Sequence, residues 1–411
     1  MSGHFDSLET RDPAVRERDL MARLPALVAH ARESTAHFAK LLSAVDPAGV
    51  GSRADLAKLP VTRKSSLMEL QKAAPPFGGL NATPASGLAR IFASPGPIYD
   101  PEGRRPDFWR TARGLFAAGF REGDVVLNCY SYHLTPAGSM FETGLHRLGC
   151  AVIPGGVGQT ELQARVIEDL RPSGYVGTPS FLKMILEKCD ELGTDASSIR
   201  RALLSGEAFL PPVREFLRGR GIEATQAYGT ADLGIIAYET PAREGLVVDE
   251  EVILEIVRPG TGEPLPEGEV GEVVITAFND DYPLIRFATG DLSAVLAGPS
   301  PCGRTNLRIK GWMGRADQTT KVRGIFVHPE QVAQVLGRHG LSRARLVVGN
   351  AGGNDLLTLR VERAGADDAA LVKSIEATLR DVTKLRGDVQ FVVVGSLPND
   401  GKVIEDARQY A

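Results

Sequence analysis

Hydrophobic and polar positions follow two alternating patterns between residues 124 and 229. Short apolar runs are separated by stretches in which apolar residues recur every three or four positions, as they do along amphipathic helices. This pattern predicts strands at 124–130, 151–154, 175–178, 201–206 and 223–229, and helices at 136–149, 160–170, 180–193 and 211–221. Strands that alternate with helices form parallel sheets with helices on their faces, and ligands bind at the carboxyl ends of such strands.

The pattern changes after residue 249. Apolar runs at 250–257 and 272–278 are joined by RPGTGEPLPEGEVG, whose glycines and prolines predict an antiparallel excursion. Beyond Gly314 the pattern predicts, in order, a helix at 328–340, strands at 344–349 and 355–362, a helix at 367–385 and a strand at 389–395. We therefore expect an α/β protein with a large N-terminal domain, 1–313, and a small α+β C-terminal domain, 314–411, with the hinge at 314–324.

Composition narrows the class of protein. The 411 residues exceed what one hydrophobic core usually serves, and 43% hydrophobic with 24% charged residues is typical of a folded globular chain. The formal net charge is -4 and the basic residues form no run, which argues against nucleic-acid or anionic-membrane partners. We expect small-molecule ligands. The charged N-terminus and the lack of a long apolar run predict a cytoplasmic protein with no membrane partner.

The cysteines stand far apart and include no C-x-x-C pair; they are Cys129, Cys150, Cys189 and Cys302. This spacing argues against a disulfide framework and against a cysteine-based zinc site. We expect four buried thiols.

A proline-rich stretch, FASPGPIYDPEG at 92–103, has the composition of a loop that holds a ligand. Pro95, Pro97 and Pro101 have no N–H group, so a phosphate cradle made of main-chain amides would be poor here. The sequence predicts a loop whose ligand is left open at this point.

Three glycine-containing stretches fall at the carboxyl ends of expected strands: SGEAF (205–209), YGTAD (228–232) and FATGDL (287–292). Each combines a glycine, which lets backbone approach a ligand, with a carboxylate that suits hydroxyl groups or a metal ion. Taken singly, each is better explained as a strand-to-helix turn with an N-capping carboxylate. Taken together and in this order, they favour a binding site.

Further stretches occur in order along nearly the whole chain: LETRDPAVRERDLMARLPALVAHA, DLAKLPVTRKSSL, AVIPGG, GTPSFL, YPLIRFATGDL, GRADQTTKVRGIFVHPEQV and LPNDGKV. With the three loops they resemble the phenylacetate-coenzyme A ligases, within the adenylate-forming acyl-CoA synthetase superfamily. The resemblance implies that a carboxylic acid attacks the α-phosphate of ATP to give an acyl-adenylate, from which the thiol of coenzyme A displaces AMP. It also implies a small mobile C-terminal domain that rotates between these steps. Whether the protein forms a homodimer is left open.

The resemblance implies nucleotide-binding roles for several residues. The adenine strand end corresponds to Ser205, Gly206, Glu207, Ala208 and Phe209, and the residues beside the base correspond to Tyr228, Gly229 and Thr230. Asp291 corresponds to the carboxylate that accepts both ribose hydroxyls, Arg315 to an arginine that contacts the ribose, and Asp317 to the hinge residue.

Two further residues correspond to positions that serve the reaction itself. Asp232 stands where the family usually has a glutamate that helps to hold magnesium, and it is one methylene shorter. Lys402 resembles the lysine that pairs with the acyl carboxylate and the α-phosphate oxygens. An ammonium on a flexible stem can stabilise charge that develops at phosphorus, whereas without the other motifs Lys402 would be a solvated lysine after a glycine turn.

The segment NCYSYHLTPAG, 128–138, corresponds to the aromatic substrate loop of the family. Tyr130, Tyr132 and His133 are therefore candidates to line the acyl pocket. A histidine beside tyrosines is more often a hydrogen-bonded packing residue than a catalyst, so we expect His133 to contact substrate only.

The sequence departs from the family in two places. Where the family has a Ser-, Thr- and Gly-rich phosphate loop, only Ser94 and Gly96 match in kind, and Arg104 or Arg105 would have to replace the lost donors. Where members often have zinc ligands, this chain has Thr240, Val247 and Ser300, which leaves Cys302 alone. One ligand cannot form a tetrahedral site, so we expect no zinc.

Three functions stay open. The first is an AMP-forming ligase that uses ATP, magnesium and coenzyme A to activate a carboxylic acid. The resemblance favours an aromatic acid. The second is a nucleotide- or acyl-CoA-binding protein that has lost adenylation, and the third is a transferase that uses a preformed adenylate or another acceptor. Release of pyrophosphate from ATP separates the first function from the other two.

Overall fold

The computed structural model describes residues 3–94, 97–316, 318, 320–323, 325–351, 354–365 and 368–408. The chain forms two compact units. The first consists of Met1–Leu254, Ile275–Phe287 and Leu296–Trp312, and the second of Glu255–Val274, Ala288–Val295 and Met313–Ala411. The second unit includes two segments that precede residue 313, and the predicted domain boundary at 313/314 stays a prediction.

A nine-stranded sheet, in the order β14-β15-β10-β9-β8-β7-β6-β4-β5, contains the five strands expected from the alternating pattern. These are β4 (Val125–Asn128), β5 (Ala151–Ile153), β6 (Gly174–Gly177), β7 (Arg201–Leu204) and β8 (Glu223–Thr230). They pair in parallel, which confirms the predicted parallel sheet. The remaining strands are β9 (Gly234–Glu239), β10 (Leu246–Val248), β14 (Val295–Leu296) and β15 (Arg308–Ile309). Antiparallel pairing of β8, β9, β10 and β15 makes the sheet mixed.

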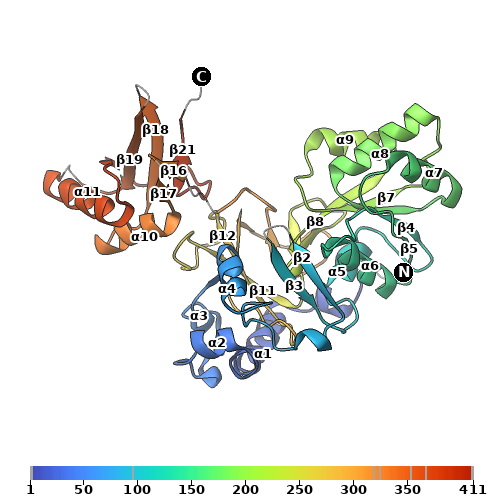
Figure 1. Ribbon diagram of the computed structural model, residues 1–411, viewed down its shortest axis with the longest axis horizontal. Coiled ribbons are helices and arrows are strands. Elements are labelled where there is room, and N and C mark those ends of the chain that lie inside the picture. Colours follow the sequence, from blue (N-terminus) through green and yellow to red (C-terminus); the bar gives the residue numbers. More distant parts are fainter. Residues whose placement is uncertain are drawn as a thin grey trace. The chain divides into compact units, whose positions relative to one another are not determined.

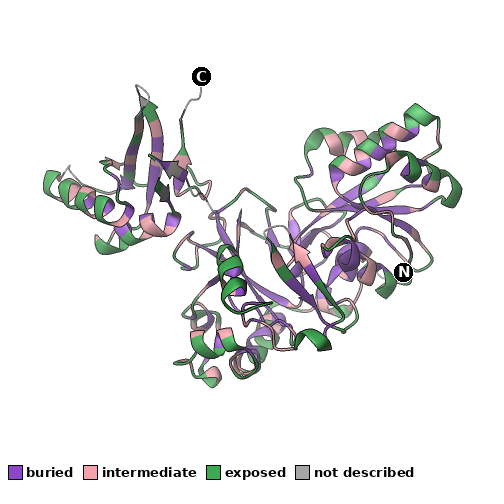
Figure 2. Ribbon diagram, viewed as in Figure 1, coloured by how far each residue is buried: buried purple, intermediate pink, exposed green. Residues whose placement is uncertain are grey.

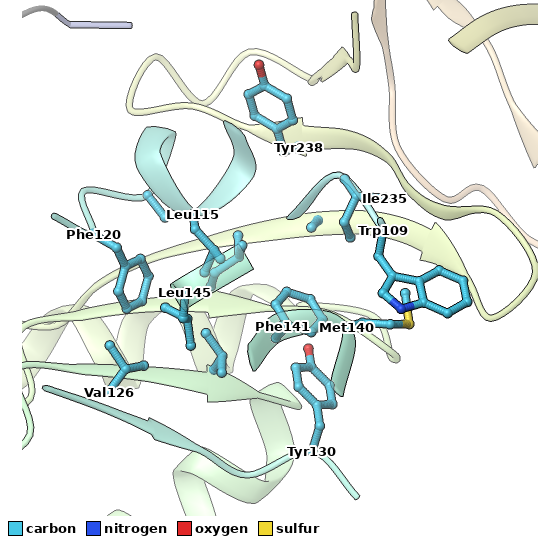
Figure 3. Close-up of a cluster of buried hydrophobic side chains, with 14 of the residues drawn as sticks. Trp109, Leu115, Phe120, Val126, Tyr130, Met140, Phe141, Leu145, Ile235 and Tyr238 are labelled. Atoms are coloured by element: carbon cyan, nitrogen blue, oxygen red, sulfur yellow. The ribbon is translucent and has the colours of Figure 1, made fainter. Parts of the chain in front are cut away.

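Helices cover both faces of the parallel strands (Figure 1). They are α5 (Thr111–Ala117), α6 (Ala137–Arg147), α7 (Thr160–Leu170), α8 (Pro179–Leu192) and α9 (Pro211–Gly219). Successive strand residues point to opposite faces: Val126 packs in a cluster with Phe141 of α6, whereas the next residue, Leu127, packs in a cluster with Ile185 of α8. Figure 3 shows the first cluster, and Figure 2 shows that the strands are buried while the outer helix faces are exposed.

The chain before this sheet is mostly helical. Its elements are η1 (Ser7–Thr10), α1 (Pro13–Ser34), α2 (Ala36–Leu41), η2 (Pro47–Gly49), α3 (Arg53–Leu56), β1 (Thr62–Arg63), η3 (Lys64–Ser66), α4 (Leu67–Ala73) and η4 (Ala85–Gly87). The longest, α1, begins after Asp12, whose side chain accepts the N–H groups of Ala14 and Val15. Among the described residues, every helix is too short or too polar to span a lipid bilayer.

The prediction of a loop at 92–103 is wrong. The stretch forms a hairpin of β2 (Arg90–Ser94) and β3 (Ile98–Glu102), with Phe92 opposite Asp100. These strands form a two-stranded sheet, so each has one edge free of ladder bonds. A proline such as Pro101 is tolerated at such an edge because its missing N–H breaks no ladder bond, a possibility that proline content alone does not reveal.

The expected antiparallel excursion lies in a four-stranded sheet, in the order β1-β13-β12-β11. Its strands include β11 (Val252–Val257), β12 (Gly271–Ala277) and β13 (Phe287–Ser293). The FATGDL stretch belongs to β13, so its prediction as a loop after a strand is wrong. The stretch reads as a loop because of its glycine, yet Gly290 is only a local irregularity in the strand, with φ of 75°.

The C-terminal part of the second unit has the expected α+β pattern. Its elements are β16 (Thr320–Val322), β17 (Ile325–Val327), α10 (Pro329–Arg338), β18 (Ala344–Ala351), β19 (Asn354–Glu362), α11 (Ala369–Thr383), β20 (Asp388–Val392) and β21 (Ile404–Asp406). The order β20-β19-β18-β21 gives a four-stranded sheet whose core includes Leu346, Leu359 and Ile375. The short strand β21 and the antiparallel pair β16–β17 were not predicted; β16 lies in the expected hinge segment and β17 follows it.

A buried ion pair ties the N-terminal segment to the first unit. Glu9, which is fully buried in η1, accepts a hydrogen bond from Nε of Arg304 at 2.6 Å and another from the hydroxyl of Tyr238 at 2.9 Å. Both charged side chains are shielded from water, so neither can be solvated if its partner is lost.

We predict that Arg304→Met lowers the free energy of unfolding by about 3–5 kcal/mol, because it leaves Glu9 charged and buried without its partner. Urea denaturation followed by tryptophan fluorescence measures the change. The exposed pair Arg171–Asp195 serves as a control, since Arg171→Ala should cost no more than about 1 kcal/mol. Equal effects of the two substitutions would contradict a structural role for the buried pair.

Candidate functional site

Three segments of the first unit bring charged side chains together. Asp232 follows β8, Lys64 begins η3, and Asp100 lies in the middle of β3. The ammonium of Lys64 pairs with Oδ2 of Asp232, and the charge of Asp232 acts on Asp100. Only Asp232 was assigned from the sequence. Lys64 lies in LPVTRKSSL, a stretch that contributed to the family resemblance. Asp100 was not predicted as a site residue because its strand was interpreted as a loop.

Buried hydrogen bonds hold these segments in place. The guanidinium of Arg286, which is almost fully buried, donates to the carbonyls of Ala57 and Leu59 at 2.7 Å each, and its own carbonyl accepts the N–H of Thr62. This anchors the chain just before Lys64. Strand β3 is held to α4 because the side chain of Gln71 bonds to both main-chain groups of Tyr99.

Burial controls the electrostatics of the cluster. Burial and the negative charge of Asp232 together raise the pKa of Asp100 to about 7, although a hydrogen bond from Ser94 and the charge of Lys64 oppose the shift. Burial, together with the charges of Asp232 and Asp100, also raises the pKa of Tyr282 well above its usual value. One ammonium, that of Lys64, thus acts on the two carboxylates of Asp232 and Asp100.

The predicted adenine strand end lies directly after β7. Gly206 has φ of 87°, which favours glycine, and this lets the chain turn at Ser205. Glu207 is exposed, and its Oε1 accepts the N–H of Ser180 at the start of α8 at 2.6 Å. Ala208 is exposed, and Phe209 is buried beneath the guanidinium of Arg214 at 4.2 Å.

The YGTAD stretch begins inside β8 rather than after it. Tyr228 is buried, and the pairing with β9 shifts register between Tyr228 and Gly229. The hydroxyl of Thr230 accepts the N–H of Leu233, which closes the turn that carries Asp232. The turn therefore directs Asp232 toward the buried cluster, although the stretch is only in part the loop that we expected.

In the second unit the structure brings together two of the predicted nucleotide residues. Nη1 of Arg315 donates to Oδ1 of Asp291 at 2.8 Å, and the two residues form an isolated β-bridge. Gly290 makes room for this pair, since a Cβ there would lie 2.7 Å from the Arg315 guanidinium. Asp291 is buried while the Arg315 side chain is half exposed, so the pair can meet a ligand from solvent.

Lys402 is exposed and lies beside a cavity of about 390 Å³ in the second unit. Its flanking backbone is fixed by one side chain. Nε2 of Gln318 donates to the carbonyl of Gly401 at 2.9 Å, and Oε1 of Gln318 accepts the N–H groups of Val403 at 2.5 Å and Ile404 at 2.8 Å. Sequence reasoning missed Gln318, although it neighbours the predicted hinge residue. That residue, Asp317, lies outside the described residues.

The candidate acyl-pocket residues follow β4. The ring of Tyr130 stacks on Phe141 of α6, with centroids 4.6 Å apart and planes 16° apart (Figure 3). The hydroxyl of Tyr132 accepts a hydrogen bond from Asn128 at 2.8 Å. A Cβ at Gly138 would lie 2.8 Å from the Tyr132 ring, so glycine at this position leaves room for that ring. His133 is exposed.

The residues expected at the phosphate loop give little support for a cradle of donors. Ser94 ends β2, with its hydroxyl 3.3 Å from the carbonyl of Ile98, and Gly96 lies outside the described residues. Arg104 donates to the carbonyls of Gly87 and Leu88, and Arg105 pairs with Glu251. The expectation that either arginine replaces the lost phosphate donors gains no support, because both are bound to other parts of the chain.

Several known proteins are similar to this chain over much of its length. The AMP-binding enzyme family model matches residues 108–278, which include the stretches after β4, β7 and β8. The phenylacetate-coenzyme A ligase of Thermus thermophilus is 35% identical over 331 residues, covering 76% of this chain and 73% of that protein. The enzyme of the same name from Escherichia coli is 30% identical over 426 residues, covering 97% of this chain and 96% of that protein. The chain belongs to the phenylacetate-coenzyme A ligase family.

Solved structures support the fold of this family member. An open conformation of 2-hydroxyisobutyryl-CoA ligase, in complex with 2-HIB-AMP and CoA, superposes with a TM-score of 0.74 at 24% identity. The match covers 97% of this chain and 92% of that chain, so the similarity includes both compact units. It confirms the predicted fold class, α/β with parallel and antiparallel sheets and a separate C-terminal part.

In this member of the phenylacetate-coenzyme A ligase family, the thiol of Cys302 lies where other members often have zinc ligands. The Sγ atom of Cys302 lies 3.0 Å from the hydroxyl of Ser300 and 3.6 Å from Nη1 of Arg304. The positive charge of the guanidinium beside the sulfur disfavours binding of a metal cation there. The expectation that the protein binds no zinc stays a prediction. Cys302 is only partly buried, so the prediction of four buried thiols is wrong for this residue, whose segment lacks a covering helix or strand.

We predict that Cys302 is alkylated by iodoacetamide increasingly fast between about pH 6 and about pH 8. Partial burial opposes ionisation, but hydrogen bonds from Ser300, Thr240 and Arg304 outweigh it and lower the pKa of this thiol to about 7. The thiolate therefore forms as the pH rises through neutrality. Mass spectrometry of tryptic peptides measures the rate.

The other cysteines provide an internal control. Burial raises the pKa of Cys129 to about 12 and that of Cys150 to about 11, and it also raises the pKa of Cys189. These thiols should stay unmodified in the folded protein over the same pH range. A Cys302 that reacts only above about pH 9, as an ordinary thiol does, would contradict the predicted shift.

Proposed function

We propose that the chain is an AMP-forming ligase that activates a carboxylic acid with ATP and transfers the acyl group to coenzyme A. The observation that carries the proposal is identity of 30% or more to phenylacetate-coenzyme A ligases along as much as 97% of the chain. The placement of Asp232 and the Asp291–Arg315 pair supports it, since both present carboxylates in settings suited to a nucleotide.

Each proposed nucleotide contact follows from local chemistry. Ser205–Phe209 end a buried strand with a positive-φ glycine, which lets backbone approach the adenine, and Tyr228 lies beside it on the neighbouring strand. Asp291 accepts hydrogen bonds from both ribose hydroxyls while Arg315 holds its side chain in place. Lys402 stabilises the charge that develops on the α-phosphate as the acid attacks.

Magnesium is part of the proposal through Asp232. Its Oδ1 is buried and has no hydrogen-bond partner among the described residues, so a carboxylate oxygen is available to a cation. Hard carboxylate oxygens suit magnesium, which supplies charge neutralisation for the triphosphate. The chain itself orients this ligand through the turn closed by Thr230, and the Lys64 ammonium balances it when no cation is bound.

We propose an aromatic acid as substrate. The stacked rings of Tyr130 and Phe141 lie in one buried cluster with Trp109 and Met140, which gives an aromatic and apolar surface near the end of β4 (Figure 3). Flat rings bind well to such a surface through stacking and burial of apolar area. The names of the curated relatives point in the same direction.

One observation favours a second candidate, a nucleotide-binding protein that does not adenylate. The β2–β3 hairpin occupies the place of the phosphate loop, and both candidate arginines bind other parts of the chain. Fewer donors would then stabilise departing pyrophosphate. Incubation with ATP, magnesium and aromatic acids decides between the candidates, because only the ligase releases pyrophosphate and forms acyl-CoA.

We predict that Lys402→Ala lowers the rate of acid-dependent pyrophosphate release by at least about 100-fold. Thioester formation from a supplied acyl-adenylate should stay largely intact, because the lysine is proposed to stabilise charge only in the first half-reaction. Each half-reaction is measured separately by single-turnover assays. Equal loss of both half-reactions would show that Lys402 supports the fold or the nucleotide instead.

We predict that Gln318→Ala lowers kcat of the same half-reaction by about tenfold with little change in KM for ATP, since it removes three hydrogen bonds that position the Lys402 segment. Gln318→Glu keeps an acceptor for Val403 and Ile404 and should lose less. A rise in KM alone, or equal loss of thioester formation, would contradict a positioning role.

A further inference from the structure

Arg345 is a buried arginine to which neither the family resemblance nor the proposed reaction gives a role. It lies in β18, and its side chain is 6% exposed. A buried guanidinium needs partners that compensate for the loss of water. In the part of the chain that the structure describes, its side-chain hydrogen bonds all go to residues 398–405, the segment that contains Lys402.

The guanidinium of Arg345 holds this segment on both sides of Lys402. Nη2 donates to the carbonyl of Pro398 at 3.2 Å and pairs with Oδ1 of Asp400, while Nη1 donates to Oε2 of Glu405 at 3.0 Å. Asp400 precedes Lys402 by two residues, and Glu405 follows it by three. Because the planar guanidinium offers its donors in fixed directions, these partners fix both ends of the turn relative to β18.

Asp400 connects Arg345 to Lys402. The Oδ1 atom that pairs with Arg345 also accepts the main-chain N–H of Lys402 at 3.0 Å. An aspartate that bonds to the N–H two residues on forms an Asx turn, and Gly401 between them has φ of 71°, which glycine adopts without strain. Gln318 binds main-chain groups on either side of Lys402, whereas the N–H of Lys402 itself is bound by Asp400.

We propose that Arg345 is a positioning residue for adenylation, which orients Asp400 and, through it, the main chain of Lys402. The inference rests on the role proposed above for Lys402. A lysine has a long, flexible stem, so fixing its main chain raises the share of conformations in which the ammonium reaches the α-phosphate. The bond between Arg345 and Asp400 joins two charged groups, and such bonds are stronger than those of neutral groups.

The competing explanation is that Arg345 only fastens β21 to β18. These strands pair in parallel, with Val347 opposite Glu405. An arginine that only stabilises this pairing would act through Glu405 at least as much as through Asp400. The side chains of Asp400 and Glu405 are 37% and 36% exposed, so they form a matched pair. Of the two, only Asp400 binds Lys402 among the described contacts.

Single-turnover assays of acid-dependent pyrophosphate release on the full-length protein, at varied ATP concentration, test the proposal. We expect Asp400→Ala to lower the rate at saturating ATP by about tenfold with little change in KM, and Glu405→Ala to change it by less than about twofold. Arg345→Met should also lower the rate by about tenfold, because Asp400 loses the group that orients it. The carboxylates that this variant leaves unpaired are both partly exposed, so it buries no unpaired charge.

Two further variants distinguish positioning from support of the fold. If Arg345 acts through Asp400, the double variant Arg345→Met with Asp400→Ala should be no slower than Arg345→Met alone. Asp400→Asn keeps an acceptor for the N–H of Lys402 and should be faster than Asp400→Ala. Additive losses, or equal damage by Glu405→Ala and Asp400→Ala, would overturn the inference and leave Arg345 as a support of β21.

Hydrogen exchange at the N–H of Lys402, measured without substrates by mass spectrometry with electron-transfer fragmentation, separates this inference from the proposed function. Exchange should be at least about tenfold faster in Asp400→Ala and Arg345→Met, and unchanged in Glu405→Ala. Unchanged exchange in the first two variants would overturn the inference, and pyrophosphate release by the unmodified chain would still support the ligase. Faster exchange in variants of a chain that releases no pyrophosphate would support the positioning of Lys402 and contradict the ligase.

Discussion

Parallel pairing of β4, β6, β7 and β8 is the constraint on which the candidate site of the first unit depends. Parallel strands place their carboxyl ends at one edge of the sheet, and side chains that follow them must gather there. Tyr130 follows β4, Ser205 follows β7 and Asp232 follows β8. These three predicted site residues are therefore neighbours as a consequence of topology. Residues on the opposite edge would need long loops to reach the same place.

The cost of burying charge shapes this edge further. Elsewhere in the first unit each buried acid has a matching base, as Glu9 has with Arg304 and Glu250 has with Arg16. Asp100 has no such partner among the described residues, where the ion pair of Lys64 is with Asp232. An unbalanced buried charge reduces stability and is rarely retained without a function.

Much of the fold follows from local pattern because it is local in origin. The five parallel strands and their helices repeat a short unit, so alternation of apolar runs with helical periods was enough to predict them. The β2–β3 hairpin and the strand β13 were not predicted, because glycine and proline content indicates loops on average. Whether such a stretch forms a strand is decided by pairing with an adjacent or distant strand. Asp291 and Arg315 are 24 residues apart, and only the fold shows that they meet. Lys64 and Asp232 are 168 residues apart, and no local pattern links them.

Rigidity also characterises the proline-rich hairpin of β2 and β3, which lies where the family resemblance implies a glycine-rich loop. A glycine-rich loop neutralises phosphate oxygens with many weak, fixed N–H dipoles, each of which requires a flexible residue. The hairpin is held on one side by its own ladder and on another by Gln71, and it gains rigidity at the cost of those dipoles. The hairpin therefore fixes the position of Asp100 but offers few main-chain donors to a phosphate.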